Sequence, residues 1–369
     1  MLEKGKIGVH QFTILTILFT VGSSILIAPS GVAHDAKQDA WIASAAGLIG
    51  GLLLIWLYNR ITVRFPRSTF VSCCRQVLGH WLGSAVALFY FGYFFLLAAF
   101  VLRNISDFMA TQVLTQTPIQ FIHIFFLGVV IMGIRNGIET LARTAEIFLP
   151  WVFFFFLIMA VLLPPKFEFG NVVPILEYGL KPIIRASLPV LSTPYMELIV
   201  FLLIFPSVKN AAMARKAFWV GTLVGGILLV GISLLSILVL GADLTARHVY
   251  PSFSLAKKIS IGTFLERLEV IMAGIWFITI YFKLSICLYA STMTFAEVFK
   301  LRDPKPLYWP FGMLLIALSV TVYPNITYST QFASRIDFPY SLPYAVLIPA
   351  LILIVALVRG QKDHEPLRR

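Results

Sequence analysis

The sequence predicts an all-α integral membrane protein of about ten transmembrane helices, arranged as two inverted repeats of five in which helices one and six are broken. Three observations predict this fold. The 369 residues are 59% hydrophobic and only 12% charged, with a mean hydropathy of +0.88, whereas soluble domains carry about 25% charged residues. Apolar runs long enough to cross a bilayer recur along the whole chain. Two of these runs, five apart, are interrupted by glycine, proline and hydroxyl residues.

Ten apolar runs supply the expected spans. They lie at residues 9–33, 40–59, 80–104, 119–134, 141–163, 183–206, 215–240, 263–297, 306–323 and 339–358. No gap between them leaves room for a soluble module, so we expect one transmembrane domain. Its parts are a first repeat at about 9–163, a second at about 183–358 and a short cytoplasmic tail at 359–369. A cleaved signal peptide is the alternative for the first run, which exceeds the usual apolar region of about 7–15 residues.

The net charge of +12 follows the expected topology. With the N-terminus inside, 18 of the 29 lysines and arginines fall in inner segments and 9 in outer loops. An inside excess of this kind is the positive-inside pattern of membrane proteins. We therefore attribute the basicity to membrane orientation and to attraction toward anionic lipid, and expect no nucleic-acid partner.

Catalytic and metal-binding patterns are not found in the sequence. Cys73 and Cys74 are adjacent and Cys287 lies within a span, which gives no zinc spacing. Neither HExxH nor GxSxG occurs. We expect no enzymatic activity, no catalytic residue, no metal site and no cofactor.

The breaks in the first and sixth runs predict a ligand site. The first run reads TVGSSILIAPSG over residues 20–31, and the sixth reads IIRASLPVLSTPYMELIVFLLIFP over residues 183–206. Gly22 lets the backbone leave the helix at low cost, and Pro189 and Pro194 each remove a helical hydrogen bond. Broken helices at matching positions of two halves indicate a transporter fold that binds its ligand near the bilayer midplane. The alternative is two simple kinks, because proline and glycine are common in membrane helices.

Two ionisable residues lie deep in the expected spans. Glu197 follows the break in the sixth span, and Lys283 lies near the middle of the eighth. Burying a charge at the bilayer centre costs at least about 2.5–3.5 kcal/mol on insertion scales, so we expect the two to interact across the cavity, directly or through water. Glu197 would gate, carry a proton or contact an amino group, and Lys283 would replace a sodium ion between spans one and eight. The alternatives are a structural hydrogen bond for Glu197 and snorkelling for Lys283.

Short motifs along almost the whole chain carry a family resemblance. They are VHQFTILTILFTVG, VGSSILIAPSGV, DAWI (39–42), GYF (92–94), TPIQ (117–120), YMELIVFLLIFP (195–206), ERLE (266–269) and VYP (322–324). In their order and spacing the chain resembles the B subunit of the nutrient-germinant receptors of bacterial endospores. That family is a branch of the amino acid–polyamine–organocation superfamily, whose fold is LeuT-like.

This resemblance implies a function, partners and a pocket. Such proteins sense a nutrient, often an amino acid, in the spore inner membrane, together with a membrane-bound A subunit and a lipoprotein C subunit. Ligand binding triggers ion release and germination. The implied pocket consists of Gly22, Ser23, Ser24, Ile25, Tyr93, Ser192, Thr193, Tyr195 and Glu197. The alternative function is a proton- or sodium-coupled transporter of an amino acid or another small solute, because both functions use the same fold and pocket.

The sequence departs from the wider superfamily at two of these positions. Ser24 stands where relatives often have the second glycine of a Gly-x-Gly turn, and Tyr195 stands where they often have a glycine two residues before the glutamate. Both changes argue against an alanine-sized amino acid as the ligand and allow a different nutrient. Lys283 is not implied by the resemblance.

Overall fold

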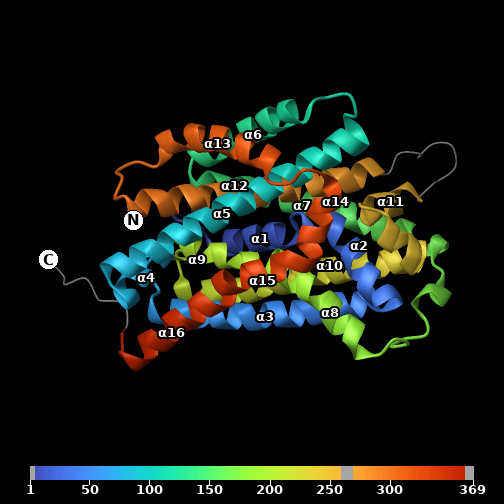
Figure 1. Cartoon of the computed structure of the whole chain (residues 1–369), viewed down its shortest axis with the longest axis horizontal. Coiled ribbons are helices and arrows are strands. Elements are labelled where there is room, and N and C mark those ends of the chain that lie inside the picture. The colour runs from blue at the N-terminus through green and yellow to red at the C-terminus, as the bar shows by residue number, and fades with distance from the viewer. Residues whose placement is uncertain (1–4, 259–268, 362–369) are drawn as a thin grey trace.

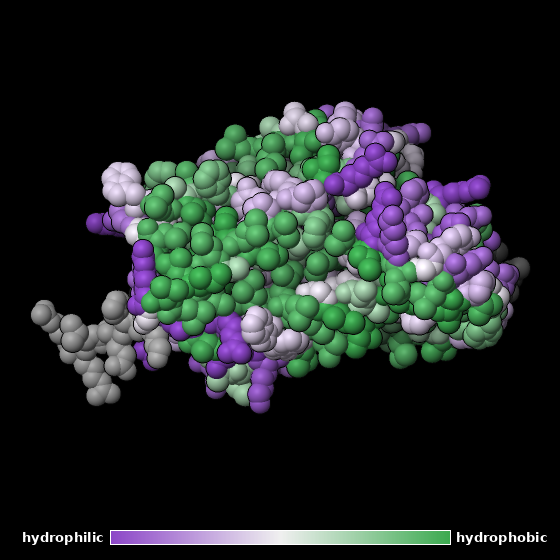
Figure 2. Space-filling model, turned by 60° about the horizontal axis from the view of Figure 1, so that its bottom comes forward, coloured by the Kyte–Doolittle hydropathy of each residue, from purple (hydrophilic) through white to green (hydrophobic). Residues whose placement is uncertain are grey.

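The computed structural model describes residues 5–258 and 269–361 of the chain. Its long helices lie side by side along the longest axis (Figure 1). Among the described residues, 7 helices are long and apolar enough to cross a membrane by length and composition, and two shorter apolar helices accompany them. Figure 2 shows hydrophobic side chains over the middle of one face and hydrophilic ones gathered toward both ends, as a membrane-spanning bundle requires.

The helices of the first half correspond to the first five expected spans. They are α1 (Val9–Val21) with α2 (Ser24–Ala36), α3 (Ala40–Arg64), α5 (His80–Phe108) with η2 (Met109–Val113), α6 (Ile119–Arg135) and α7 (Ile138–Leu162). Short elements connect or follow them: η1 (Lys37–Asp39), α4 (Phe70–Leu78), η3 (Pro164–Lys166) and η4 (Phe169–Val172).

The second half supplies the other five spans. The sixth consists of α8 (Leu180–Val190), η5 (Leu191–Tyr195), η6 (Met196–Val200), α9 (Phe201–Ile204) and η7 (Phe205–Ser207). The seventh to ninth are α10 (Ala211–Arg247), α12 (Glu269–Val298) and α13 (Tyr308–Thr321), with α11 (Pro251–Lys257) and η8 (Lys305–Leu307) between them. The tenth consists of α14 (Ile326–Gln331), η9 (Phe332–Ile336), α15 (Asp337–Leu342), η10 (Pro343–Leu347) and α16 (Ile348–Val358).

Two boundaries differ clearly from the sequence prediction, and a third cannot be compared. The tenth span begins at Ile326 rather than at 339, because the polar residues of its first turns face a cavity and lower the hydropathy of the run. Helix α10 continues to Arg247, with an interruption at Gly241. The first residues of the expected eighth span, and with them most of the ERLE motif, lie outside the described residues.

Helices of the two halves pack in corresponding pairs. Helix α3 packs against α10, α5 against α12, and α6 against α13, so each pair joins a span to its counterpart five spans later. Helix α7 contacts α1 and α12, and the tenth span contacts η5 and η6 of the sixth in the same way. This exchange of equivalent contacts is the pattern that an inverted repeat produces.

Both ends of the described chain lie at the predicted inner end of the bundle. Ile7 forms an isolated parallel β-bridge with Val208, in the loop between spans six and seven. Arg359 donates to the Val77 carbonyl oxygen at 2.9 Å, in the loop between spans two and three. An even number of spans places both ends on one side, which the positive-inside pattern assigns to the cytoplasm.

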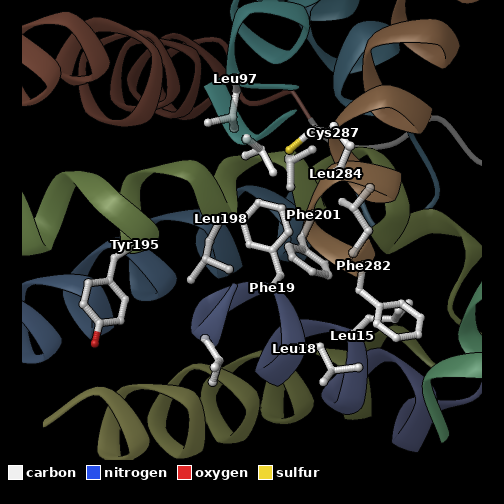
Figure 3. Close-up of a cluster of buried hydrophobic side chains, with 14 of the residues drawn as sticks. Leu15, Leu18, Phe19, Leu97, Tyr195, Leu198, Phe201, Phe282, Leu284 and Cys287 are labelled. Atoms are coloured by element: carbon white, nitrogen blue, oxygen red, sulfur yellow. The ribbon is translucent and has the colours of Figure 1, made fainter. Parts of the chain in front are cut away.

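Aromatic side chains close the inner half of the bundle. The ring of Phe12 meets those of Phe201, Phe205 and Phe218 edge-on, at centroid distances of 5.5, 5.9 and 5.7 Å. Figure 3 shows Phe19 facing Phe201 in the same cluster. Edge-to-face contacts of this kind favour dense packing, so the inner side of the two broken helices is filled by side chains.

Small residues in α3 allow the sixth span to approach closely. A Cβ atom at Gly47 would overlap Val190, and one at Gly51 would overlap the Tyr195 ring. The run GLIGGLL (47–53) therefore serves helix packing, as small residues commonly do in membranes.

Candidate ligand site

The first span is interrupted at Gly22. Helix α1 ends at Val21 and α2 begins at Ser24. Between them the backbone of Gly22 has φ +28°, in the region that favours glycine because other residues carry a Cβ atom. A Cβ atom there would lie 2.6 Å from both the Lys283 Cδ and the Phe19 carbonyl oxygen. The sequence therefore needs glycine here for its conformation and for the close approach of Lys283.

Hydroxyl groups of neighbouring helices donate hydrogen bonds to carbonyl oxygens that lack a helical partner near the break. Thr279 Oγ1 in α12 donates to the Gly22 carbonyl oxygen at 3.1 Å. Pro29 has no N–H group to donate to the Ile25 carbonyl oxygen four residues earlier, and Ser252 Oγ in α11 donates to it instead, at 2.7 Å. These contacts stabilise a real discontinuity, because free backbone groups need a partner within a membrane.

The sixth span is broken at Thr193, whose backbone is extended at φ −115° and ψ 113°. Pro189 and Pro194 flank this residue. The turn around it is a π-helix and the next turn is a 3₁₀-helix, so the helical hydrogen bonds change register across the break. The two breaks predicted from the sequence are thus both present.

A carboxylate from the tenth span binds the hydroxyl groups at this break. Asp337 Oδ2 accepts hydrogen bonds from Ser192 Oγ and from Thr193 Oγ1, the latter at 2.8 Å. Asp337 was not among the predicted site residues, because the sequence placed it in an outer loop. One signal could have found it: Asp337 and Ser341 are four residues apart, and therefore share one helix face, at the start of a long apolar run.

Lys283 and Glu197 form a buried ion pair. Lys283 Nζ lies 2.5 Å from Glu197 Oε2, and the two side chains are 0% and 7% exposed. Lys283 Nζ also donates to Ser23 Oγ at 3.0 Å and lies 5.4 Å from the centroid of the Phe19 ring. One ammonium group thus connects the first, sixth and eighth spans. Removing either partner of such a pair leaves a buried charge uncompensated, at a cost of about 3–5 kcal/mol.

A cavity of about 280 Å³ opens beside the two breaks. The part of its wall that the breaks form contains Ser23, Ser24, Thr193 and Glu197, together with Asp337. The rest comes from the outer ends of α2, α5 and α10, from the end of α8, from α14 and η9, and from connecting residues Val249, Tyr250 and Tyr323. Because these segments lie on the outer side of the breaks and aromatic side chains fill the inner side, the cavity faces the outside.

The structure brings some of the predicted pocket residues to the cavity and leaves others behind its wall. Ser23, Ser24, Thr193 and Glu197 line it. The predicted residues that do not line it are Gly22, Ile25, Tyr93, Ser192 and Tyr195. Gly22, Ile25 and Ser192 shape the breaks through the contacts described above.

The two tyrosines lie elsewhere for identifiable reasons. Tyr195 points toward α3 and α10, where Gly51 and Gly226 leave room for its ring, and Figure 3 shows it apart from the central cluster. Tyr93 stacks on Tyr344 at a centroid distance of 4.5 Å and donates to Ser341 Oγ at 3.4 Å. Tyr93 therefore contacts the tenth span behind Asp337.

Ser24 presents an unused polar group to the cavity. Its side chain is buried, and within the described part of the chain its Oγ has no hydrogen-bond partner. Buried polar groups are normally paired, so this hydroxyl is available to a bound molecule. Within the same part of the chain, no group of three or more His, Cys, Asp or Glu side chains could hold a metal ion.

Comparison with known proteins identifies the family. The family described as spore germination protein matches residues 6–328. Spore germination protein KB of Bacillus subtilis (strain 168) is 30% identical over 99% of this chain and 98% of its own length. Spore germination protein GerLB of Bacillus cereus is 25% identical over 96% of this chain and 95% of its own length.

Solved structures identify the fold. Mhp1, a nucleobase-cation-symport-1 family transporter solved in a closed conformation with bromovinylhydantoin bound, superposes with a TM-score of 0.69 at 15% identity, over 96% of this chain and 79% of that one. MhsT in complex with L-phenylalanine superposes with a TM-score of 0.65 at 14% identity, over 94% of this chain and 97% of that one. At these identities the likeness shows the fold alone, which is LeuT-like.

The relatives and the solved structures named above each cover nearly all of the chain. Germination-receptor and permease-like proteins of this kind are not known as enzymes. The expected fold and the expected family are therefore confirmed. The chain belongs to the spore germination protein family, as a multi-pass membrane B subunit of a germination receptor with a transporter-like fold.

Proposed function

We propose that this B subunit senses a nutrient by binding a small molecule, such as an amino acid, near the bilayer midplane between the broken helices. The observation that carries this proposal is the cavity, whose wall includes both breaks and the unpartnered hydroxyl of Ser24. Ser23, Ser24, Thr193 and Glu197 contact the ligand directly. The remaining predicted residues hold the wall in shape.

Binding becomes a signal when the ligand prefers one conformation of the subunit. A ligand shifts a conformational equilibrium only by its difference in affinity for the two states. The cavity is bounded by outer segments of the first, third, sixth, seventh and tenth spans, so contraction around a ligand moves several spans together. In the proposed mechanism this movement is passed to the A and C subunits in the spore inner membrane and leads to ion release.

Lys283 takes the place of a coupling cation in this proposal. A sodium ion in a related fold would connect the first and eighth spans, and the ammonium group makes such a connection here through Ser23, while Glu197 adds the sixth span. Because this positive charge is covalently attached, ligand binding needs no sodium. Glu197 then gates the site by holding the sixth span to Lys283.

Germination of spores that carry variants tests the proposal. Ser24→Leu and Thr193→Leu fill the cavity and should abolish the response to the nutrient. Ser187→Leu is the matched control, because Ser187 precedes the sixth-span break and does not line the cavity, and it should respond as the wild type does. Immunoblots for the A subunit establish that each receptor assembles. Normal germination of both assembled cavity variants, at every nutrient concentration, would contradict the proposal.

Transport of an amino acid or small solute, driven by protons or sodium, is the second candidate function. The fold favours it, because Mhp1 is a transporter and shares this architecture. Uptake into proteoliposomes that contain this subunit alone separates the two functions. A sensor should bind its ligand with little flux, whereas accumulation driven by a proton or sodium gradient would establish transport.

A further inference from the structure

Among the described residues the carboxyl group of Asp337 has no ion-pair partner of its own, because Lys283 is paired with Glu197. Two carboxyl groups, those of Glu197 and Asp337, lie in the cavity wall at the breaks. One ammonium group, that of Lys283, contacts Glu197, so the acidic groups outnumber the basic one. From this excess negative charge we propose that Asp337 is a ligand-binding residue that selects nutrients with a protonated amino group. The inference rests on the proposed function, since it assigns a substrate class to the same cavity.

The hydrogen bonds of Asp337 hold its carboxylate in place and leave acceptor capacity. Ser192 and Thr193 both donate to Oδ2. Ser341 Oγ lies 3.4 Å from Oδ1, which is a weak contact. A carboxylate oxygen accepts about two hydrogen bonds, so Oδ1 can receive an ammonium N–H group. The broken sixth helix thus orients a carboxylate of the tenth span toward the cavity.

The other charged groups of the cavity do not supply the missing counterion. Asp107 is a third carboxylate in the cavity wall. The positive charge of Arg103 is already paired with it, because Arg103 Nε lies 2.8 Å from Asp107 Oδ1. The Nη1 of the same arginine donates to the carbonyl oxygens of Val320 and Tyr323, each at 3.0 Å, at the end of α13. Arg247 is exposed to solvent, where its charge is screened. A cationic ligand therefore restores neutrality at the breaks.

An organic amine fits this site better than a calcium ion does. Calcium requires about six to eight oxygen ligands, and the described residues provide no cluster of three or more acidic or imidazole groups. An amine needs only a few hydrogen-bond acceptors of fixed direction. Ser24 Oγ, which lines the same cavity, is free to bind a second polar group of the molecule. The expected ligand is a small amine with a further polar group.

Charge-selective labelling tests the inference before any nutrient is known. A reporter thiol, Ala28→Cys, is placed in the cavity wall, at a half-buried residue that makes none of the contacts above. The rate of its modification is measured with a cationic reagent, trimethylammonium-ethyl methanethiosulfonate, and separately with an anionic reagent, sulfonatoethyl methanethiosulfonate. The native cysteines are buried in the structure, and the chain without the reporter measures their background reaction.

The inference predicts faster reaction with the cationic reagent and a loss of this preference in Asp337→Asn. The ratio of the two rates should fall by about tenfold, because one unit charge acts on probes of opposite sign across a partly polar medium. Asp243→Asn, an exposed carboxylate outside the cavity wall, is the matched control and should leave the ratio unchanged. An unchanged ratio in Asp337→Asn overturns the inference. If Ala28→Cys does not react, Ala333→Cys in the tenth span serves as the second reporter.

Binding of paired probes then separates this inference from the proposed function. Amino acids and their 2-hydroxy acid analogues are compared by thermal stabilisation of the purified full chain, in sodium and in choline buffer. The inference predicts that the amino form binds more tightly and that Asp337→Asn removes the difference. The inference is overturned if a sugar binds equally well to the wild type and to Asp337→Asn, or if binding requires sodium. Either result leaves the sensor function standing. If nothing binds, the sensor function of the isolated subunit fails, while the labelling ratio still decides the role of Asp337.

Discussion

The Lys283–Glu197 pair allows a quantitative test of how the broken helices are held together. Glu197→Gln removes the negative charge beside the buried ammonium group of Lys283, which keeps its contact with Ser23 Oγ at 3.0 Å. Lys283→Met leaves Glu197 buried near a second carboxylate, Asp337. Each single substitution should lower the free energy of unfolding by about 3–5 kcal/mol, since an uncompensated charge remains in a low-dielectric interior.

The double variant should be more stable than the sum of these losses predicts. Glu197→Gln with Lys283→Met removes both charges together, and replacing a whole buried pair by neutral groups is often close to neutral. We expect a coupling energy of about 2–3 kcal/mol, at the upper end for residues in direct contact. Equilibrium unfolding by SDS in mixed micelles measures all four proteins.

An exposed ion pair provides the control for this double-mutant cycle. Arg143 and Glu139 lie 2.5 Å apart, with side chains 69% and 41% exposed. Glu139→Gln should cost less than about 1 kcal/mol, because solvent screens surface pairs. If the losses of unfolding free energy in the Lys283–Glu197 double-mutant cycle are additive, the two residues do not stabilise each other and the reasoning is refuted. If each loss is no larger than that of the exposed pair, the site is hydrated.

Two glycine substitutions test the packing that forms the site, by the same unfolding measurement. Gly22→Ala should destabilise by about 1–3 kcal/mol, because its backbone conformation is strained for any other residue, whereas Gly92→Ala, in an open stretch of α5, should stabilise by up to about 1 kcal/mol. Gly51→Ala should cost about 1–3 kcal/mol by overpacking against Tyr195, whereas Gly128→Ala on α6 meets no atom within 4 Å and should be tolerated. If Gly22→Ala behaves like Gly92→Ala, the backbone strain at Gly22 is absent, and if Gly51→Ala behaves like Gly128→Ala, the close contact with Tyr195 is absent.

The features predicted from the sequence were those with a local cause. Proline removes a helical hydrogen bond and glycine lets the backbone leave the helix at low cost, so the two runs that combine them with hydroxyl residues at matching positions could be identified as breaks before the structure was known. The contact between Glu197 and Lys283 was expected because each charge is costly to bury alone. Helix boundaries within the apolar runs were also close, since hydropathy reports contact with lipid.

Features that depend on the direction of a side chain were not predictable in this way. The extended backbone at Thr193 changes the direction of every side chain that follows it, so Tyr195 faces α3 rather than the cavity. Asp337 was missed because hydropathy cannot separate a polar residue in a loop from one in a helix that lines a cavity. Both outcomes depend on tertiary structure rather than on local propensity.

Ligand binding by the purified subunit tests the central claim most directly. Thermal unfolding is measured across amino acids, sugars and nucleosides for the wild type, Ser24→Leu, Thr193→Leu and the control Ser187→Leu. A ligand at a hundredfold excess over its dissociation constant stabilises the folded state by about 2.7 kcal/mol. The account predicts a stabilising nutrient whose effect disappears in both cavity variants and persists in the control. A nutrient that stabilises all four proteins equally would place the binding site elsewhere and contradict the account.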